Sequence, residues 1–296
     1  MTLGAIAILG AGWFLARPMQ AHVGAAPLDL AAETVSIAGG SNGIIRGWFS
    51  PGKRGVGAVL LMHGNGDNRT SMLGRARFLH REGYAVLLID LQGHGESPGR
   101  HLTFGALESV DARAALDFLR AHAPTERIGV IGYSLGGAAA LLGATPLPVD
   151  AMVLEAVYPT IEDATANRLR VYLGPLGPLL LPVLTAQIHL WTGISASALR
   201  PIDGISRVVV PMLLIAGERD TRTTLTDSQR MFAAAHAPKE LWIVPDAGHD
   251  DFHGTHGAAY EKRVGGFLRL HLHSTDAGGS QSRVSEGPPA ALTSSR

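Results

Sequence analysis

The stretch VIGYSLGGAAALL, residues 130–142, decides how the rest of this sequence is interpreted. An apolar run ends at Gly132, a serine follows two residues later, and a run that favours a helix begins at once. This spacing matches the pattern G-x-S-x-G, in which a sharp turn from strand to helix presents a serine hydroxyl above a sheet. The same residues also suit a structural turn with Ser134 as a helix N-cap. The stretch alone leaves both interpretations open.

The sequence on both sides of this turn alternates between strand and helix patterns. Residues 33–50 hold two strand-like segments around the turn signal GSNG, which predicts an antiparallel hairpin. The apolar runs VGAVLLM, YAVLLI, RIGVIG, VDAMVL, VVVPMLLIA and ELWIVP predict buried strands. Helices are predicted between them, over residues 69–81, 104–122, 134–143, 225–236 and 258–273. The pattern predicts an α/β fold with a mostly parallel eight-stranded sheet and helices on both faces.

Polar residues follow the predicted strands at the edge of the sheet where sites form in α/β proteins. Ser134 follows one strand, Asp220 follows a later one, and His249 follows the last. A histidine that takes the serine proton, and an acid that orients the histidine, make a serine hydroxyl a useful nucleophile. We therefore predict that Ser134 is the nucleophile, His249 the base and Asp220 the orienting acid.

These segments resemble the α/β-hydrolase family of serine hydrolases. LLMHGNG, LIDLQGHGESPG, GYSLGG, AGERD and DAGH occur in the family's order within residues 33–273. Their nearest resemblance is to bacterial esterase-like and lysophospholipase-like members, some of which have an N-terminal anchor. The resemblance implies an α/β-hydrolase fold, an acyl-enzyme on Ser134 and no metal or organic cofactor. It also implies an oxyanion hole made by the amides of Leu135 and Asn65, with Gly66 as the alternative to Asn65. Further substrate contacts are expected from Gly66, Tyr133 and Tyr158.

Several neighbouring residues offer alternatives to these assignments. Glu155 also ends a strand and is the second candidate for the orienting acid, while His253 and His256 lie close to His249 in sequence. The histidine cluster could instead bind a metal, but no second group of ligands is apparent. We expect Asp90 and His94 to hold a loop rather than to take part in catalysis.

The two ends of the chain differ from the body. Residues 1–29 contain an apolar run at 2–16, shorter than the roughly 20 residues that span a bilayer. A membrane anchor, a signal peptide and a buried helix all fit, and we expect the anchor, hence a membrane-anchored protein. Residues 30–273 form the predicted hydrolase domain. Residues 274–296 are rich in Ser, Gly and Pro, which predicts a disordered tail.

Within the domain, residues 158–206 interrupt the alternation of strands and helices, and we interpret them as a small apolar cap insertion. The segment mixes leucines and prolines with few charges and is long for an ordinary connection. In the family, cap segments are inserted here over the site. An apolar cap favours a small-molecule ester with an apolar group as substrate, and it could also touch a membrane.

Composition excludes several classes of function. Lys+Arg and Asp+Glu both number 25, with no basic block, so a nucleic-acid partner is not expected. The absence of cysteine excludes disulfides and a cysteine nucleophile. The best interpretation is a serine hydrolase that cleaves carboxylic esters, including lipid-derived esters or thioesters. An amidase or acyltransferase with the same triad, a haloperoxidase-like or dehalogenase-like enzyme, a non-catalytic scaffold and a membrane-tethered interaction protein are the alternatives.

Overall fold

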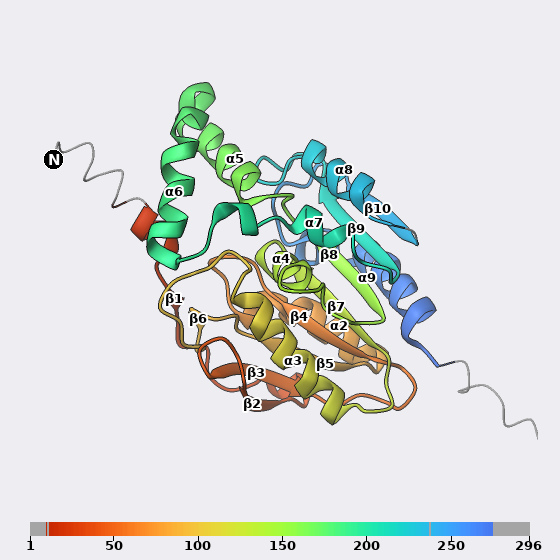
Figure 1. Cartoon of the computed structure of the whole chain (residues 1–296). Helices are drawn as coiled ribbons and strands as arrows, with labels where there is room; N and C mark the ends of the chain where they lie inside the picture. Colours follow the sequence, from red (N-terminus) through yellow and green to blue (C-terminus); the bar gives the residue numbers. More distant parts are fainter. Residues whose placement is uncertain (1–9, 11, 237, 275–296) are drawn as a thin grey trace, which may run out of the picture.

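The computed structural model describes residues 10, 12–236 and 238–274 and is built on one large sheet (Figure 1). The predicted eight-stranded sheet is confirmed, with the order β10-β9-β8-β7-β4-β5-β3-β2. Only the β2–β3 and β3–β5 pairs are antiparallel, and all others in this sheet are parallel. The strands are β2 (Glu33–Ala38), β3 (Ile44–Ser50), β4 (Ala58–Met62), β5 (Ala85–Ile89), β7 (Ile128–Tyr133), β8 (Ala151–Glu155), β9 (Met212–Gly217) and β10 (Lys239–Val244).

The central strands are buried on both faces, as their continuous apolar sequences predict. In β4, Leu60 and Met62 pack into the core on one side of the sheet. Val59 and Leu61 pack into the core on the other side. Because successive side chains of a strand point to opposite faces, one short apolar run supplies both cores.

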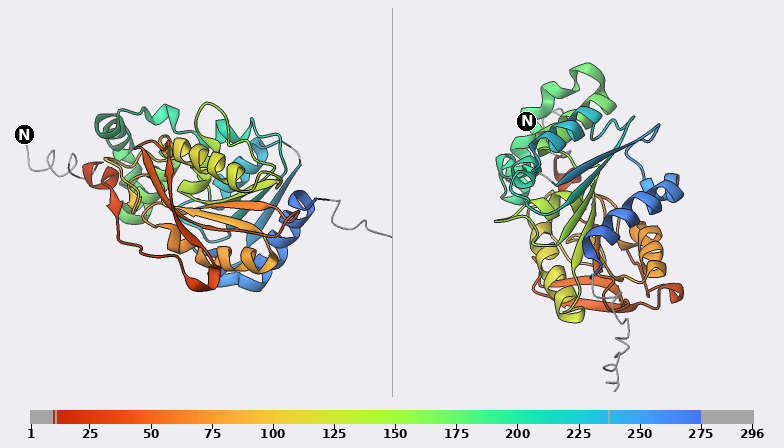
Figure 2. Two further views of the ribbon diagram at one scale, coloured as in Figure 1. Left: turned by 90° about the horizontal axis from the view of Figure 1, so that it is seen from below. Right: turned by 90° about the vertical axis from the view of Figure 1, so that its right-hand side faces the viewer.

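Helices cover both faces of the sheet (Figure 2). One core contains residues of α3, α4, α7 and α8, and the other contains residues of α2 and α9. These helices are α2 (Leu73–Glu82), α3 (Glu108–His122), α4 (Leu135–Leu141), α7 (Pro201–Ile205), α8 (Leu225–Ala234) and α9 (Phe252–Leu272). The 3-10 helix η2 (Arg69–Met72) leads into α2.

Helix α3 begins later than the sequence pattern predicts. Phe104 has a φ of +53°, which a right-handed helix does not allow. The carboxylate of Glu108, the first residue of the helix, accepts hydrogen bonds from the amides of Thr103 and Gly105 at 3.0 and 2.8 Å. The predicted first turn is therefore a loop folded over the helix N-terminus.

The segment that interrupts the alternation folds as a helical cap. It contains α5 (Ile161–Leu173), η3 (Gly174–Leu180), α6 (Leu181–Thr192) and η4 (Ala196–Ala198). Helices α5 and α6 pack against each other and stand above the carboxyl ends of the strands (Figure 1). The prolines that obscure this helical pattern lie mostly in the first turn of a helix, where proline is tolerated: Pro175 is the second residue of η3 and Pro182 the second residue of α6.

The N-terminal segment runs along the body beside this cap. Residues 12–16 are helical, and Gly12 and Ala16 are buried. Strand β1 (Met19–Gln20) pairs in parallel with β6 (His94–Gly95) in a separate small sheet. The first nine residues of the predicted anchor or signal lie outside the described residues, as do residues 275–296 of the predicted tail.

Candidate active site

Ser134 occupies a strained turn between β7 and α4. Its φ of +49° and ψ of −105° are unusual for any residue with a side chain, and they turn the chain sharply from strand to helix. A Cβ on Gly132 would lie 2.6 Å from the backbone of Gly137, and one on Gly136 would lie 2.3 Å from the carbonyl oxygen of Met62. The glycines around Ser134 are therefore required by close backbone approach, as the G-x-S-x-G pattern implies.

Three predicted residues meet at this turn. His249 Nε2 lies 3.3 Å from Ser134 Oγ, and His249 Nδ1 lies 2.7 Å from Asp220 Oδ2. The other carboxylate oxygen of Asp220 accepts hydrogen bonds from the amides of Arg222 and Thr223 at 2.7 and 2.8 Å. These bonds hold the Asp220 carboxylate in place, and its contact with His249 Nδ1 would orient the ring so that Nε2 can accept the serine proton.

The alternative residues are engaged elsewhere. Glu155 accepts hydrogen bonds from Arg75 Nε and from the Tyr260 hydroxyl, at 3.0 and 2.5 Å. His253 contacts Glu261, and His256 contacts the Thr255 hydroxyl. None of these side chains lies within hydrogen-bonding distance of Ser134 Oγ, so the described residues contain one arrangement of serine, histidine and acid.

Two predicted oxyanion donors lie beside the serine hydroxyl. Asn65 and Leu135 line a cavity that also includes Ser134. In the described chain neither the Asn65 nor the Leu135 amide nitrogen donates a hydrogen bond to another protein group. Two amides without internal partners beside a nucleophile are suited to stabilise an oxyanion.

His63 fixes the loop that carries Asn65. The amide of Leu91 donates to His63 Nε2 at 3.1 Å, so Nε2 carries no proton and Nδ1–H donates to the carbonyl oxygen of Gly64 at 2.7 Å. Burial, together with the neighbouring His94, lowers the pKa of His63 to about 3. His63 is therefore a neutral structural residue beneath the loop.

The predicted loop residues Asp90 and His94 hold neighbouring segments. Asp90 forms a buried ion pair with Arg69 and accepts a hydrogen bond from the amide of Glu96 at 2.9 Å. His94 Nδ1 lies 3.0 Å from the carbonyl oxygen of Gln92. Neither side chain contacts Ser134, His249 or Asp220, which agrees with a structural role.

An apolar cavity of about 170 Å³ opens beside Ser134 beneath the cap. Tyr158 and Leu135 line it, together with Leu184 and Ile188 of α6. Its remaining lining is Gly12, Leu15, Ala16, Asn65, Phe104, Ile161, Ala164, Thr165, Arg168, Leu169 and Tyr172. Nothing in the sequence pattern singles out the residues from the N-terminal segment, because only tertiary packing brings them to the site. The cavity is suited to an apolar group bound next to the nucleophile.

A polar cleft of about 460 Å³ lies on the other side of the same serine. Gly66, Tyr133 and His249 line it, and Ser134 and Asn65 belong to both cavities. Its charged lining residues are Asp67, Arg75, Arg168, Arg222, Asp250 and Asp251. Ser134 therefore stands at the junction of an apolar and a polar compartment.

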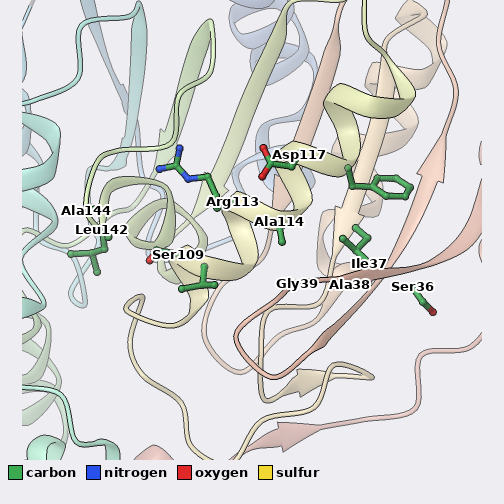
Figure 3. A pocket seen from close by; sticks show the side chains of 13 residues that line it. Ser36, Ile37, Ala38, Gly39, Ser109, Arg113, Ala114, Asp117, Leu142 and Ala144 are labelled. Atoms are coloured by element: carbon green, nitrogen blue, oxygen red, sulfur yellow. The ribbon is translucent and has the colours of Figure 1, made fainter.

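A third hollow, of about 540 Å³, is remote from this chemistry (Figure 3). It lies between β2 and α3, where Ile37, Arg113 and Asp117 are among its lining residues, and it includes no member of the triad. Over the residues described, no cluster of three or more histidine or acidic side chains is placed to hold a metal ion.

Comparisons with known proteins support the fold. A sequence profile of the alpha/beta hydrolase family matches residues 59–263. An uncharacterized protein of Mycobacterium tuberculosis is 34% identical over 209 residues, which are 69% of this chain and 68% of that protein. The uncharacterized protein YfhR of Salmonella typhi is 26% identical over 266 residues, 83% and 84% of the two chains. Among solved structures, the esterase Pf2001 of Pyrococcus furiosus has a TM-score of 0.71 at 27% identity, covering 86% of this chain and 98% of its own.

Proposed function

This chain belongs to the alpha/beta hydrolase family, and from that premise we propose that it cleaves carboxylic esters through an acyl-enzyme on Ser134. The predicted α/β-hydrolase fold is confirmed by the family match and by the likeness to the Pyrococcus furiosus esterase. That likeness supports a hydrolase. The ester chemistry and the covalent intermediate are our proposal.

One observation carries the proposal: Ser134 Oγ, His249 and Asp220 form a connected line of contacts of 3.3 and 2.7 Å. A scaffold that only binds a ligand has no need of this chain of contacts at a strained serine. The unpartnered amides of Asn65 and Leu135 beside the same hydroxyl support the assignment.

The proposed reaction follows from these contacts. Ser134 Oγ attacks the ester carbonyl carbon and gives its proton to His249 Nε2. The Asn65 and Leu135 amides donate to the negative carbonyl oxygen that forms. The bond from carbon to the alcohol oxygen then breaks, and His249 returns the proton to that oxygen. Water next attacks the acyl carbon, its proton passes through His249 to Ser134 Oγ, and the acid leaves.

The two compartments suggest how the ester is oriented. The apolar cavity beneath the cap is suited to the acyl chain, and the polar cleft is suited to the alcohol. Apolar surface removed from water contributes roughly 25 cal/mol per Å². Esters of medium-length fatty acids should therefore bind better than acetate esters.

Hydrolysis of p-nitrophenyl esters, from acetate to palmitate, tests the proposal. We expect the wild type to release nitrophenol and Ser134→Ala to lose at least about a thousandfold in kcat/KM, because the nucleophile is removed. Ser195→Ala, an exposed serine on the cap, is the matched control and should keep wild-type activity.

Labelling with a fluorophosphonate separates this proposal from the scaffold alternative. We expect Ser134 to be labelled in the folded wild type. A folded protein that leaves every ester intact and whose Ser134 escapes the label would support a scaffold. Equal ester hydrolysis by the wild type and by Ser134→Ala would exclude Ser134 as the nucleophile.

We also propose that the cap rests on a lipid surface. The helical stretch of residues 161–192 contains an 18-residue window with a mean hydropathy of 1.5, which meets the length and composition of a membrane span, and only 17% of that window is buried. The apolar N-terminal run enters the described structure beside α6 (Figures 1 and 2). Large apolar side chains are exposed on both segments: Trp13, Phe14, Leu15, Tyr172, Leu173, Leu176, Leu179, Val183 and Leu190. Exposed apolar surface on this scale marks an interaction site.

A further inference from the structure

Arg168 occupies the point where the two compartments of the site meet. It lies on α5, the first cap helix, and lines both the apolar cavity and the polar cleft. Only Ser134 and Asn65 share that property. The Arg168 side chain is half-buried, so its charge faces the site rather than bulk water.

The Arg168 guanidinium has little to balance its charge. Its one hydrogen bond to the described residues runs from Nη1 to the carbonyl oxygen of Ala164, one turn earlier in the same helix, at 3.2 Å. Among the residues that the structure describes, no carboxylate oxygen lies within 4 Å of this guanidinium. Burial is the main cause that lowers the pKa of Arg168 and Arg222 adds to it, whereas Tyr158, Tyr172 and the more distant Asp220 oppose the shift.

Arg69 and Arg75, which are fully buried, show which partners Arg168 lacks. Arg69 pairs with Asp90 and Glu96. Arg75 pairs with Glu155 and Asp251. A charge taken out of water is costly unless an opposite charge compensates it, and both of these arginines have two carboxylates. Arg168 differs because its free donors face a cavity.

A second arginine faces the same cleft. Arg222 follows Asp220 in the loop after β9, and its backbone amide donates to Asp220 Oδ1 at 2.7 Å. Its exposed side chain makes no ion pair within the described part of the chain.

The acidic residues of the cleft form no ion pair with Arg168 or Arg222 in the described structure. Asp251 pairs with Arg75, and an Asp250 oxygen accepts the amide of Gly248 at 2.7 Å. Asp67 also makes no ion pair in the described structure, and it comes from the loop after β4 rather than from the cap. Among the described residues neither guanidinium has a carboxylate oxygen within 4 Å, so Arg168 and Arg222 both lack an ion-pair partner in the cleft.

We propose that Arg168, together with Arg222, forms a binding site for an anionic group, a carboxylate or a phosphate, on the alcohol portion of the ester. A guanidinium presents two parallel N–H donors that match the oxygens of either group. The inference rests on the proposed function and makes it more specific. An acyl chain beneath the cap and an anion in the cleft place the ester carbonyl at Ser134 between them.

Matched aryl esters test this site. The substrates are 4-(butyryloxy)benzoate, 4-(butyryloxy)phenyl phosphate and the neutral 4-(butyryloxy)benzamide, which share the acyl chain and the aryl ester bond. The variants are Arg168→Gln and Arg222→Gln, with Arg170→Gln as the matched control. Arg170 is exposed on the same helix and lines neither compartment.

We expect the wild type to prefer at least one anionic ester over the benzamide by at least about tenfold in kcat/KM. Arg168→Gln should lower that ratio about tenfold, Arg222→Gln should lower it less because its side chain is exposed, and Arg170→Gln should leave it unchanged. The anionic ester that shows the larger preference identifies carboxylate or phosphate as the natural group.

Failure of this inference is distinguishable from failure of the proposed function. Equal hydrolysis of all three esters by the wild type, dependent on Ser134, would overturn the anion site and leave the esterase proposal standing. The anion site is also overturned, and the esterase proposal still stands, if Arg168→Gln lowers the hydrolysis rates of all three esters by the same factor. If no ester is hydrolysed and Ser134 escapes a fluorophosphonate, both proposals are wrong.

Discussion

His63 shows how a single buried side chain ties the candidate site to the stability of the fold. In the unfolded chain it binds a proton below its ordinary pKa of 6.5, whereas in the folded protein it does so only below about 3. Between these values the unfolded state holds more protons, so the free energy of unfolding falls as the pH drops. The slope from this one group approaches about 1.4 kcal/mol per pH unit.

We predict that His63→Asn makes the free energy of unfolding depend less on pH. Urea unfolding of the wild type and of the variant, between pH 7 and pH 4.5, measures it. The variant should be less stable at pH 7, because the bonds to Gly64 and Leu91 change, and should lose less stability on acidification. His236→Asn, an exposed substitution, is the control. Identical pH slopes for the wild type and His63→Asn would contradict the assignment.

At the residue scale, the proximity of residues that follow different strands was predictable, because a parallel sheet brings the carboxyl ends of its strands together. Ser134 and His249 are 115 positions apart in the chain, and the alternation of strands and helices alone indicates that they meet. Arg168 was not predictable. It lies on a helix outside that alternation, and its importance comes from the absence of a partner, which only the packed structure reveals.

At the element scale, α6 should set the length of the acyl chain. We predict that Leu184→Trp, which fills part of the apolar cavity, lowers kcat/KM for decanoate esters about tenfold and for acetate esters much less. Chain-length profiles with p-nitrophenyl esters measure the change. Val183→Trp, the adjacent and exposed position, is the control. An unchanged profile for Leu184→Trp would place the acyl chain outside this cavity.

The cap was predictable as an insertion but not as a pair of packed helices. Strands are recognisable from short apolar runs, whereas the leucine-rich cap sequence lacks a clear helical period and contains several prolines. Pro178 lies inside η3, where helix-breaking residues argue against any helix. The contact between α5 and α6 stabilises a helical path that the local sequence favours only weakly.

At the scale of the whole molecule, the exposed face of the cap should decide whether the protein binds lipid. We predict that the full chain floats with phosphatidylcholine vesicles and that a double variant, Leu176→Asp with Leu179→Asp, lowers its partition coefficient at least about tenfold. Fully burying a leucine contributes about 1.5–3 kcal/mol, and these two are 73% and 75% exposed.

Val209→Asp is the control for this measurement, since Val209 is equally apolar and 81% exposed but lies outside the cap. Flotation that is equally strong for the double variant and the wild type would exclude the cap as the lipid-binding face. Absence of flotation by the wild type would exclude lipid binding itself.

The order of the strands in the sheet also determines when the proposed triad can be completed during synthesis. Ser134 follows the internal strand β7, whereas His249 follows β10, which is the edge strand and the last strand in the chain. A ribosome releases the nucleophile long before its base, and β10 can dock only onto a β9 that is already in place. If the proposed triad is correct, the nascent chain carries a serine without its base throughout translation, and hydrolytic activity can arise only with the final stage of folding.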